Sequence, residues 1–363
     1  MAPLIILCGL RDFVVSIPEM NPAATDLQSL PKVDLHRHLE GSIRLTTLVE
    51  LAERGEIPLP ANQAKLKRMV TVQPGDPASH AHFLSRFGRL RQVFQSEAII
   101  RRIAAEAVED ARLDGVRHLE LHLTPPALAQ AADFDYEDVI EWVWQAGSSA
   151  AGSDLSVGLV VSLNRHEPVS LAERAVAAAL AQPEGVIALD LAGDEAAHDA
   201  APFADLLARA KQAGVFISVH AGEWNGPGSV RQAIELLGAD RIAHGVRAME
   251  DRDTVLMARD RGIPFAVCLT SNVQSGVVGG YADHPLPAMI QAGLQVSLNT
   301  DDPSVSGIRL TDEYQLAVDM LGLSVESIQM VVLAGAQSAF LPAKPKASLV
   351  DSLQQAFGLS AGE

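Results

Sequence analysis

Cysteine is almost absent from the sequence, with only Cys8 and Cys268 among 363 residues. Two cysteines cannot build a disulfide framework or a cysteine-rich zinc site. The simplest interpretation is a protein that works in a reducing compartment. We therefore expect a cytoplasmic location.

Long apolar runs and basic clusters are missing as well. The first ten residues, MAPLIILCGL, are apolar, but Arg11 and Asp12 follow at once and no basic segment precedes them, so they make a poor signal peptide and too short a membrane span. Lys and Arg number 28 against 45 Asp and Glu, giving a formal net charge of −17 without a visible basic cluster. We expect no membrane or nucleic-acid partner and a small-molecule ligand instead. The oligomeric state is left open.

What the sequence does contain is a regular alternation of short apolar runs and amphipathic segments. In the amphipathic segments apolar residues recur at three- and four-residue spacing, which predicts helices. Gly115, Gly214, Gly238, Gly262 and Gly293 stand where helix C-caps belong. The apolar runs predict eight strands, at 32–36, 118–123, 157–163, 186–193, 216–222, 241–245, 264–269 and 295–301.

Eight consecutive β–α units predict an α/β fold with a parallel sheet, closed as a (β/α)8 TIM-type barrel. The main alternative is a doubly wound open sheet, but no G-x-G-x-x-G follows the first strand. Segment 56–96 interrupts the rhythm and predicts a helical insertion after the first strand, and 311–363 adds further helices. We expect one domain over 30–363, preceded by a dispensable N-terminal extension over 1–29.

Polar side chains gather where four of the predicted strands end, which is the active-site face of such a barrel. Because the same strands are otherwise apolar, these groups would be costly to bury without a function. The four strand ends are His36-Arg37-His38, His220 to Glu223, His244-Gly245 and Asp301-Asp302.

Each of these strand ends also has an ordinary structural interpretation. The spacing of His36 and His38 puts both on one face of a strand, but H-x-H alone is more often structural than metal-binding. His220 could be a hydrogen-bonded histidine at a strand end, and Asp301-Asp302 before Pro303 could form a turn. Together, three imidazoles and one carboxylate form a plausible zinc ligand set with room for water.

Missing motifs narrow the choice of metal site. Neither H-E-x-x-H nor the H-x-E with P-C-x-x-C of base-flipping deaminases occurs. The fourth strand ends in DLAGDE, without a lysine to bridge a second metal, so we expect one metal ion. Among the other histidines His166 is the first candidate for a functional role, because it follows the third strand. The remaining ones are interpreted as surface, capping or packing residues: His80, His82, His118, His122, His198 and His284.

Six stretches, in order from residue 30 to about 341, together resemble the adenosine deaminases of the amidohydrolase superfamily, especially the bacterial ones. They are KVDLHRHLEGSIR, DLAGDE, SVHAGE, RIAHGV, VCLTSNVQSG and SLNTDDP. The resemblance implies a barrel with one catalytic Zn²⁺. It also implies hydrolytic deamination of adenosine and 2′-deoxyadenosine to inosine and 2′-deoxyinosine, with release of ammonia, in purine salvage.

The resemblance also assigns roles to residues. Glu223 is implied to shuttle protons at purine N1, and His244 to orient the attacking hydroxide and stabilise charge. Asp302 is implied to hydrogen-bond purine N7, and the N–H of Gly193 purine N3. The implied metal ligands are His36, His38, His220 and Asp301, and the implied substrate contacts are His38, Glu40, Gly193 and Asp302.

Elementary chemistry agrees with these implied roles. Adenine C6 is a poor electrophile, and zinc lowers the pKa of bound water to near 7. Addition at C6 places negative charge on N1, where a general acid contributes roughly 10²–10⁴-fold. Glu223 lies three residues after His220, beyond Gly222, so it could approach the metal site without binding the metal.

Two residues depart from the family pattern on the sugar side of the substrate. Glu40 stands where the family commonly has Asp, linked to the ribose 5′-hydroxyl, and His122 where relatives often have Arg. Adenine deaminase, or a deaminase of a modified nucleoside such as aminodeoxyfutalosine, is therefore the alternative. A catalytically inactive relative would have lost a ligand or Glu223, and none is lost. A metal-dependent esterase or amidase is compatible with the fold alone.

Overall fold

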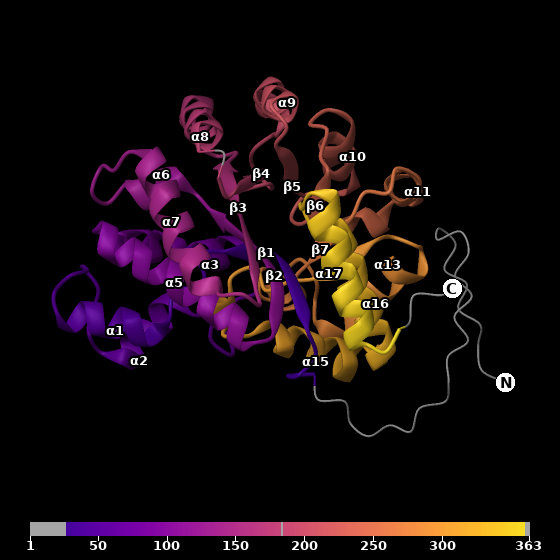
Figure 1. Cartoon of the computed structure of the whole chain (residues 1–363), viewed down its shortest axis with the longest axis horizontal. Coiled ribbons are helices and arrows are strands. Elements are labelled where there is room, and N and C mark those ends of the chain that lie inside the picture. The colour runs from indigo at the N-terminus through magenta and orange to yellow at the C-terminus, as the bar shows by residue number, and fades with distance from the viewer. Residues whose placement is uncertain (1–26, 183, 360–363) are drawn as a thin grey trace.

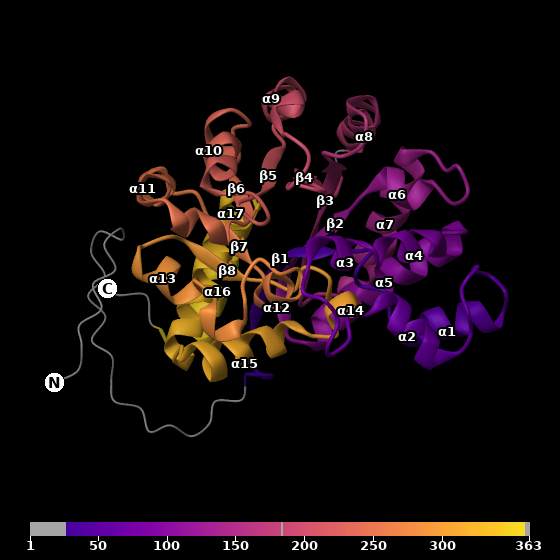
Figure 2. The ribbon, with the colours of Figure 1, turned by 180° about the vertical axis from the view of Figure 1, so that it is seen from behind.

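Eight parallel strands form one sheet whose spatial order is the order of the sequence, with helices around its outside (Figures 1 and 2). The computed structural model describes residues 27–182 and 184–359. The strands are β1 (Lys32–His38), β2 (Val116–Leu123), β3 (Ser156–Asn164), β4 (Val186–Ala192), β5 (Phe216–Ala221), β6 (Arg241–His244), β7 (Phe265–Val267) and β8 (Val296–Leu298). The (β/α)8 barrel is thus confirmed, and the doubly wound open sheet is excluded.

The helices fill the intervals between strands, as the periodicity predicts. The insertion after β1 contains α1 (Leu45–Glu53), α2 (Gln63–Val70), α3 (His80–Leu84), α4 (Phe87–Leu90) and η1 (Arg91–Val93), before α5 (Glu97–Leu113) returns to the sheet. Between β2 and β5 lie α6 (Pro125–Ala129), α7 (Tyr136–Ala151), α8 (Val169–Ala181), η2 (Ala201–Phe203) and α9 (Ala204–Gln212). Between β5 and β8 lie α10 (Pro227–Glu235), η3 (Val246–Glu250), α11 (Arg252–Asp260), α12 (Leu269–Gln274), η4 (Tyr281–Asp283) and α13 (Leu286–Gln291). After β8 come α14 (Pro303–Ser306), α15 (Leu310–Leu321), α16 (Val325–Ser338) and α17 (Ala343–Ala356).

Local sequence explains where these elements begin and end. At the start of α5 the Ser96 hydroxyl accepts a hydrogen bond from the Ile99 N–H (3.3 Å), and Glu97 stands in the first turn. The helix ends before Gly115, which has φ +83°. The other four glycines predicted at C-caps also have positive φ: Gly214, Gly238, Gly262 and Gly293.

Closure of the barrel joins the end of β8 to the end of β1. The His38 N–H donates to the Asp301 carbonyl (2.7 Å), and the Asp301 N–H donates to the His36 carbonyl (2.8 Å). These two bonds form a parallel bridge that continues the sheet beyond β8. The backbone contact that closes the sheet is therefore made by three residues of the predicted metal site.

Two predicted strand ends are wrong. The seventh strand is shorter than 264–269, because α12 begins at Leu269. The eighth ends at Leu298 and does not reach Asp301-Asp302. Asp301 has φ +59°, which is incompatible with an extended strand, and α14 begins at Pro303. The two aspartates lie in the turn between β8 and α14.

The N-terminal extension predicted over 1–29 lies outside the described residues except for 27–29. Leu27 is buried in the barrel core, and the Gln28 amide donates to Asp114 Oδ1 (3.2 Å). The dispensability of the extension and the single domain over 30–363 remain predictions. No helix within 27–182 or 184–359 is long and apolar enough to cross a membrane.

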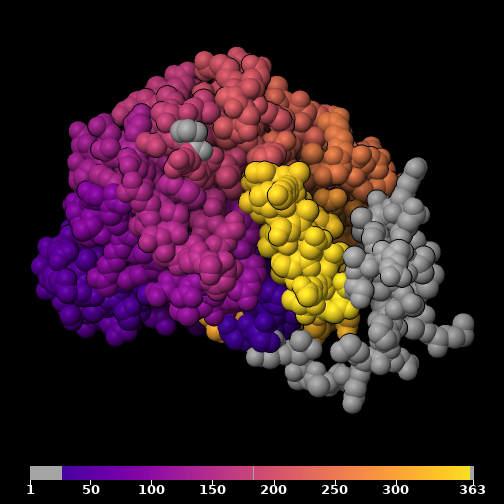
Figure 3. Space-filling model, viewed as in Figure 1, coloured from indigo at the N-terminus to yellow at the C-terminus, as the bar shows by residue number. Residues whose placement is uncertain are grey.

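α17 covers the end of the barrel at which the strands begin, whereas α16 packs against the side of the barrel, on β1 and β8. In Figure 1 α17 lies in front of the strands, and in Figure 2 it lies behind them; Figure 3 shows the C-terminal residues on this face of the molecule in yellow. Beneath them, Arg241 binds both oxygens of Glu120 (2.5 and 3.2 Å) and donates to the Ser338 carbonyl (2.8 Å). Its guanidinium also stacks on Phe340, 3.7 Å from the ring centroid.

Replacing Arg241 with Met tests this buried ion pair. Glu120 is fully buried, and although burial raises its pKa, Arg241 and His118 hold that pKa at about 2. Without Arg241 a buried carboxylate loses its partner, so we expect the free energy of unfolding at pH 7 to fall by about 3–5 kcal/mol in chemical denaturation. Arg309→Met, which breaks the exposed pair with Asp312, is the control and should cost less than about 1 kcal/mol. Equal losses in the two variants would refute the assignment.

Candidate active site

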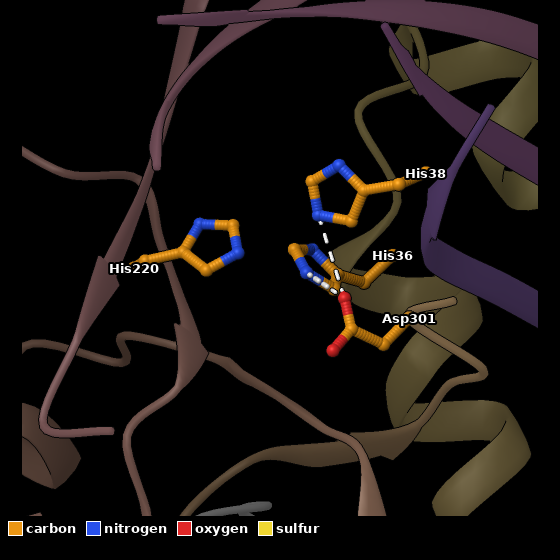
Figure 4. Close-up of side chains that lie close together, drawn as sticks. All are labelled: His36, His38, His220 and Asp301. Atoms are coloured by element: carbon orange, nitrogen blue, oxygen red, sulfur yellow. Dashed lines mark ion pairs between the residues drawn. The ribbon is translucent and has the colours of Figure 1, made fainter. Parts of the chain in front are cut away.

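Four of the predicted residues point toward one another at the carboxyl ends of the strands (Figure 4). Asp301 Oδ1 lies 3.4 Å from Nε2 of His36 and 3.4 Å from Nε2 of His38. One ligand atom from each of His36, His38, His220 and Asp301 lies within 4.8 Å of the others. The sequence placed these four residues together, and the structure brings them to one point.

The donor set fits a metal ion. Neither ring nitrogen of His36 has a hydrogen-bond partner within the described ranges, although the side chain is buried. Burying an imidazole without a partner is costly, and a cation at this point would satisfy it. Three imidazole nitrogens and one carboxylate oxygen are ligands that Zn²⁺ accepts.

The charges of these groups also suit a cation. Burial and the neighbouring His122 lower the pKa of His36 well below its usual value, and the same two causes lower that of His38 to about 3. Both rings are therefore neutral at pH 7, which is the form that binds metal. Burial alone would raise the pKa of Asp301, but His36 and His244 hold it well below its usual range, so Asp301 is a carboxylate.

Asp190 on β4 orients the third imidazole. Its Oδ2 lies 3.0 Å from His220 Nδ1, which leaves His220 Nε2 for the metal. Burial lowers the pKa of His220, but the charge of Asp190 outweighs it and the net shift is upward. A carboxylate behind a ligating histidine fixes the ring and makes it a stronger ligand. The sequence had not singled out Asp190, although DLAGDE contains it.

His122 packs against the predicted metal site. It was interpreted as a surface, capping or packing residue, and its full burial agrees with packing. Its ring centroid lies 4.4 Å from that of His36 and 5.0 Å from that of His38, and its Nδ1 lies 3.6 Å from Asp190 Oδ2. The linear spacing does not show these contacts, because they depend on the pairing of β1 with β2, which sets His38 beside His122.

Glu223 and His244 face each other beside the four donors. Glu223 Oε2 lies 3.7 Å from His244 Nε2, which is also 3.9 Å from Asp301 Oδ2. Burial raises the pKa of Glu223 well above its usual value, and the charges of Asp301 and Glu195 add to this effect. The shift favours the protonated form of Glu223. A buried protonated carboxyl can act as a general acid.

A second carboxylate, Glu195, holds the backbone of the loop that carries Glu223. It accepts hydrogen bonds from four consecutive N–H groups, those of Gly222 (2.7 Å), Glu223 (3.0 Å), Trp224 (2.7 Å) and Asn225 (3.1 Å). The Ser229 hydroxyl donates to the same carboxylate. The sequence offered no signal for this role beyond the last letter of DLAGDE, since the partners are backbone atoms.

Two of the site residues have strained backbones. His244 and Asp301 both have φ +59°, and among described residues other than glycine only Asp133 shares a positive φ. Such a conformation costs of order 1–3 kcal/mol for each residue and persists where the surroundings enforce it. Here the strain aims both side chains at the same point.

The predicted substrate contacts surround this point. Burial, followed by the charge of Asp301, raises the pKa of Asp302 well above its usual value, which favours its protonated form. A Cβ on Gly41 would lie 1.9 Å from Asp302 Oδ1, so glycine is required there. Glu40 Oε1 accepts from the Thr124 N–H (3.0 Å), while its buried Oε2 has no partner within the described ranges.

A cavity of about 440 Å³ opens above these groups. This volume is in the range of sites that enclose a small molecule. The insertion after β1 forms one wall, through Phe83 of α3 and Phe87 of α4. Nine predicted or candidate residues line the cavity: His38, Glu40, His166, Gly193, His220, Glu223, His244, Asp301 and Asp302. His36 is fully buried and does not line the cavity.

The remaining histidine predictions are of two kinds. His166 lines the cavity and accepts from the Asp194 N–H (3.3 Å), in line with its place as the exception. His198 and His284 were interpreted as surface, capping or packing residues, which agrees with the exposure of His198 and with the bond from the Leu286 N–H to His284 Nδ1. The sequence did not show that His198 also lines the cavity or that His284 is bound to Asn272 beside His244. Each comes from a loop whose approach to the site depends on the fold.

The model of the family described as "Adenosine deaminase" matches residues 31–356. An adenosine deaminase from Klebsiella pneumoniae strain 342 is 39% identical over 325 residues, covering 89% of this chain and 97% of the relative. Two solved structures extend the comparison. An adenine deaminase from Arthrobacter aurescens has a TM-score of 0.82 at 28% identity, covering 91% of this chain and 99% of its own. An Arabidopsis N6-mAMP deaminase has a TM-score of 0.80 at 29% identity, with the same coverage.

Replacing Asp190 with Asn tests the metal site without removing a ligand. The variant keeps the shape but loses the carboxylate behind His220, so we expect zinc affinity to fall about 10–100-fold in a competition assay with a chelator. Asp205→Asn, on the exposed start of α9, is the control and should bind zinc like the unaltered protein. Unchanged affinity in Asp190→Asn would contradict the assignment of His220 as a ligand.

Proposed function

The chain belongs to the adenosine deaminase family, and we propose that it hydrolyses the 6-amino group of adenosine and 2′-deoxyadenosine, giving the inosine products and ammonia. The observation that carries this proposal is the buried Glu223, which lines the cavity beside a cluster of three imidazoles and one carboxylate. A hydrolase acting on an aromatic amidine needs an acid and an activated water at one point.

We assign one Zn²⁺ to His36, His38, His220 and Asp301, where it would activate water as a nucleophile at neutral pH. The neutral rings of His36 and His38 support the assignment, as does the carboxylate behind His220. One ion agrees with the absence of a lysine in DLAGDE.

Glu223 serves as the general acid. Addition of water at C6 places negative charge on N1, and the Glu223 proton neutralises it there. Glu195 fixes the loop through four backbone N–H groups, so Glu223 stays directed at the cavity. His244 lies beside Glu223, with its Nε2 3.7 Å from Glu223 Oε2.

The purine ring is held by groups that match its acceptors. N7 and N3 are hydrogen-bond acceptors, so each needs a donor from the protein. Asp302, kept protonated by burial and by Asp301, can donate to N7, and the Gly193 N–H to N3. A Cβ at Gly193 would lie 2.5 Å from His166 Nδ1, so this backbone position must be glycine.

Glu40 and His38 face the sugar side of the substrate. The unpartnered Oε2 of Glu40 can accept a hydroxyl hydrogen bond, as expected for a ribose 5′-hydroxyl. We place the reaction in cytoplasmic purine salvage, supported by the low cysteine content and by the buried free thiol of Cys268.

Glu40 also favours the second candidate, an adenine deaminase or a deaminase of a modified adenine nucleoside. The carboxylate is one methylene longer than the family's usual aspartate, which shortens the space for a sugar. The solved relatives at 28–29% identity include an adenine deaminase and an N6-mAMP deaminase. The two candidates share the chemistry and differ in the group beyond N9.

An ammonia-release screen distinguishes these candidates. We expect turnover of adenosine and 2′-deoxyadenosine above that of adenine, 5′-substituted adenosines and aminodeoxyfutalosine, measured as kcat/KM. In Glu40→Ala, kcat/KM for nucleosides should fall at least about tenfold, since the 5′-hydroxyl loses a buried acceptor. Adenine, which has no sugar, is the internal control. A preference for adenine, or an equal loss on adenine in Glu40→Ala, would overturn the nucleoside assignment.

Glu223→Gln tests the general acid. The amide keeps the size of the side chain but cannot transfer a proton, so kcat should fall roughly 10²–10⁴-fold. Zinc content, measured on the same sample, should stay at one ion for each chain. Activity near that of the unaltered enzyme would refute the role of Glu223.

A further inference from the structure

His244 can either donate or accept a hydrogen bond in the active site, and the ring nitrogen that carries its proton decides which. A neutral imidazole donates from the nitrogen that bears hydrogen and accepts at the other one. The nitrogen facing the active site is Nε2, 3.7 Å from Glu223 Oε2. Its other nitrogen, Nδ1, lies 3.1 Å from Asn272 Nδ2, on α12. On its other side Asn272 is hydrogen-bonded to His284, which precedes α13. Asn272 Oδ1 lies 3.2 Å from His284 Nε2.

A backbone N–H group bound to His284 sets which atoms donate and which accept in the hydrogen bonds from His284 through Asn272 to His244. The Leu286 N–H lies 3.1 Å from His284 Nδ1. A peptide N–H can only donate, so His284 Nδ1 must hold a lone pair. The single ring proton of His284 is therefore on Nε2, and this nitrogen donates to Asn272.

That donation fixes the orientation of the amide. Of the two terminal atoms of Asn272 only the oxygen can accept, so the oxygen faces His284 and the amide nitrogen faces His244. An amide nitrogen donates and does not accept. His244 Nδ1 is consequently an acceptor, which excludes the imidazolium form and puts the ring proton on Nε2.

Packing holds all three side chains in place. Asn272 is fully buried, and His284 and His244 are 3% and 1% exposed. The backbone carbonyl of Asn272 accepts from the Val277 and Val278 N–H groups (2.9 and 3.1 Å), which pin the end of α12. Because none of the three side chains can rotate out to solvent, the direction of the hydrogen bonds between them is fixed.

We propose that Asn272 and His284 are positioning residues that hold His244 as its Nε2–H tautomer. His244 then donates a hydrogen bond from Nε2 into the active site and does not act there as a base. A donor aimed at the oxygen that attacks C6 orients it and stabilises the charge that develops on it. The tautomer follows from hydrogen bonding alone, whereas its kinetic consequence rests on the proposed deamination.

The tautomer can be read without substrate. In the full-length, zinc-loaded protein labelled with ¹⁵N-histidine, two-bond ¹H–¹⁵N correlations distinguish the Nδ1–H, Nε2–H and imidazolium forms. Loss of one signal set in His244→Gln identifies His244. We expect the Nε2–H form. An Nδ1–H form or an imidazolium would overturn the proposal, and neither result depends on whether adenosine is the substrate.

Asn272→Asp reverses the direction of the hydrogen bond to His244 with almost no change in the shape of the side chain. A carboxylate oxygen would then face His244 Nδ1 and require a proton there, so the Nε2–H signal should disappear. We expect kcat for the best substrate of the screen to fall about 10²–10³-fold with little change in KM, as for loss of one preorganised donor. Thr270→Ser, two residues away on α12 and bonded to Glu313 instead, is the control and should leave the tautomer and kcat unchanged. A reversed tautomer with unaltered kcat would refute the proposal.

A pair of His284 variants covers the case in which Asn272→Asp does not fold. Gln can place its Nε2 donor where the histidine has one, so His284→Gln should keep the His244 tautomer and kcat within about tenfold of the unaltered enzyme. His284→Leu removes the donor, and we expect a mixed tautomer and a kcat at least about tenfold lower than that of His284→Gln. Equal spectra and equal kcat in the two variants would contradict a positioning role.

Discussion

The site depends on the contact that closes the barrel. Two backbone hydrogen bonds join Asp301 to His36 and His38, and the same three residues supply ligand atoms. These backbone hydrogen bonds fix the distance between Asp301 and the two histidines, so their side chains meet without a long loop to hold them. Asp301 has a positive φ at the position beyond β8 where its backbone pairs with β1. Stability of the sheet and geometry of the site are one structural feature.

Buried carboxyl groups then acquire different roles from their surroundings. Asp301 and Asp190 lie against imidazoles, and the net pKa shift of each is downward, so both are anions. Glu223 and Asp302 are buried near the charge of Asp301, and both causes raise the pKa of each, which favours their neutral acid forms. In the function we propose, the two anions would bind or support a cation, and the two acids would donate to a purine. The division follows from burial and neighbours, because all four side chains carry the same chemical group.

The sequence predicted the strands and most of the site because both follow local rules. Apolar runs marked the strands within a few residues, and strand ends carried the ligands. The end of β8 was missed because the conformation of Asp301 depends on pairing with β1. The contact of His122 with His36 was missed because it is made across a sheet. Glu195, Asn272 and His284 act through backbone groups or through another side chain, and such partners leave no spacing pattern in a linear sequence.

The structure predicts one metal ion at the point where the barrel closes. A crystal of the zinc-loaded protein, with diffraction data on both sides of the zinc absorption edge, tests it most directly. We predict one anomalous peak for each chain, bonded to the imidazole nitrogens of His36, His38 and His220 and to a carboxylate oxygen of Asp301 at about 2.0–2.2 Å. A peak elsewhere, a second peak in the same site, or clear density for the four side chains without a peak would refute a single metal ion bound by these four residues.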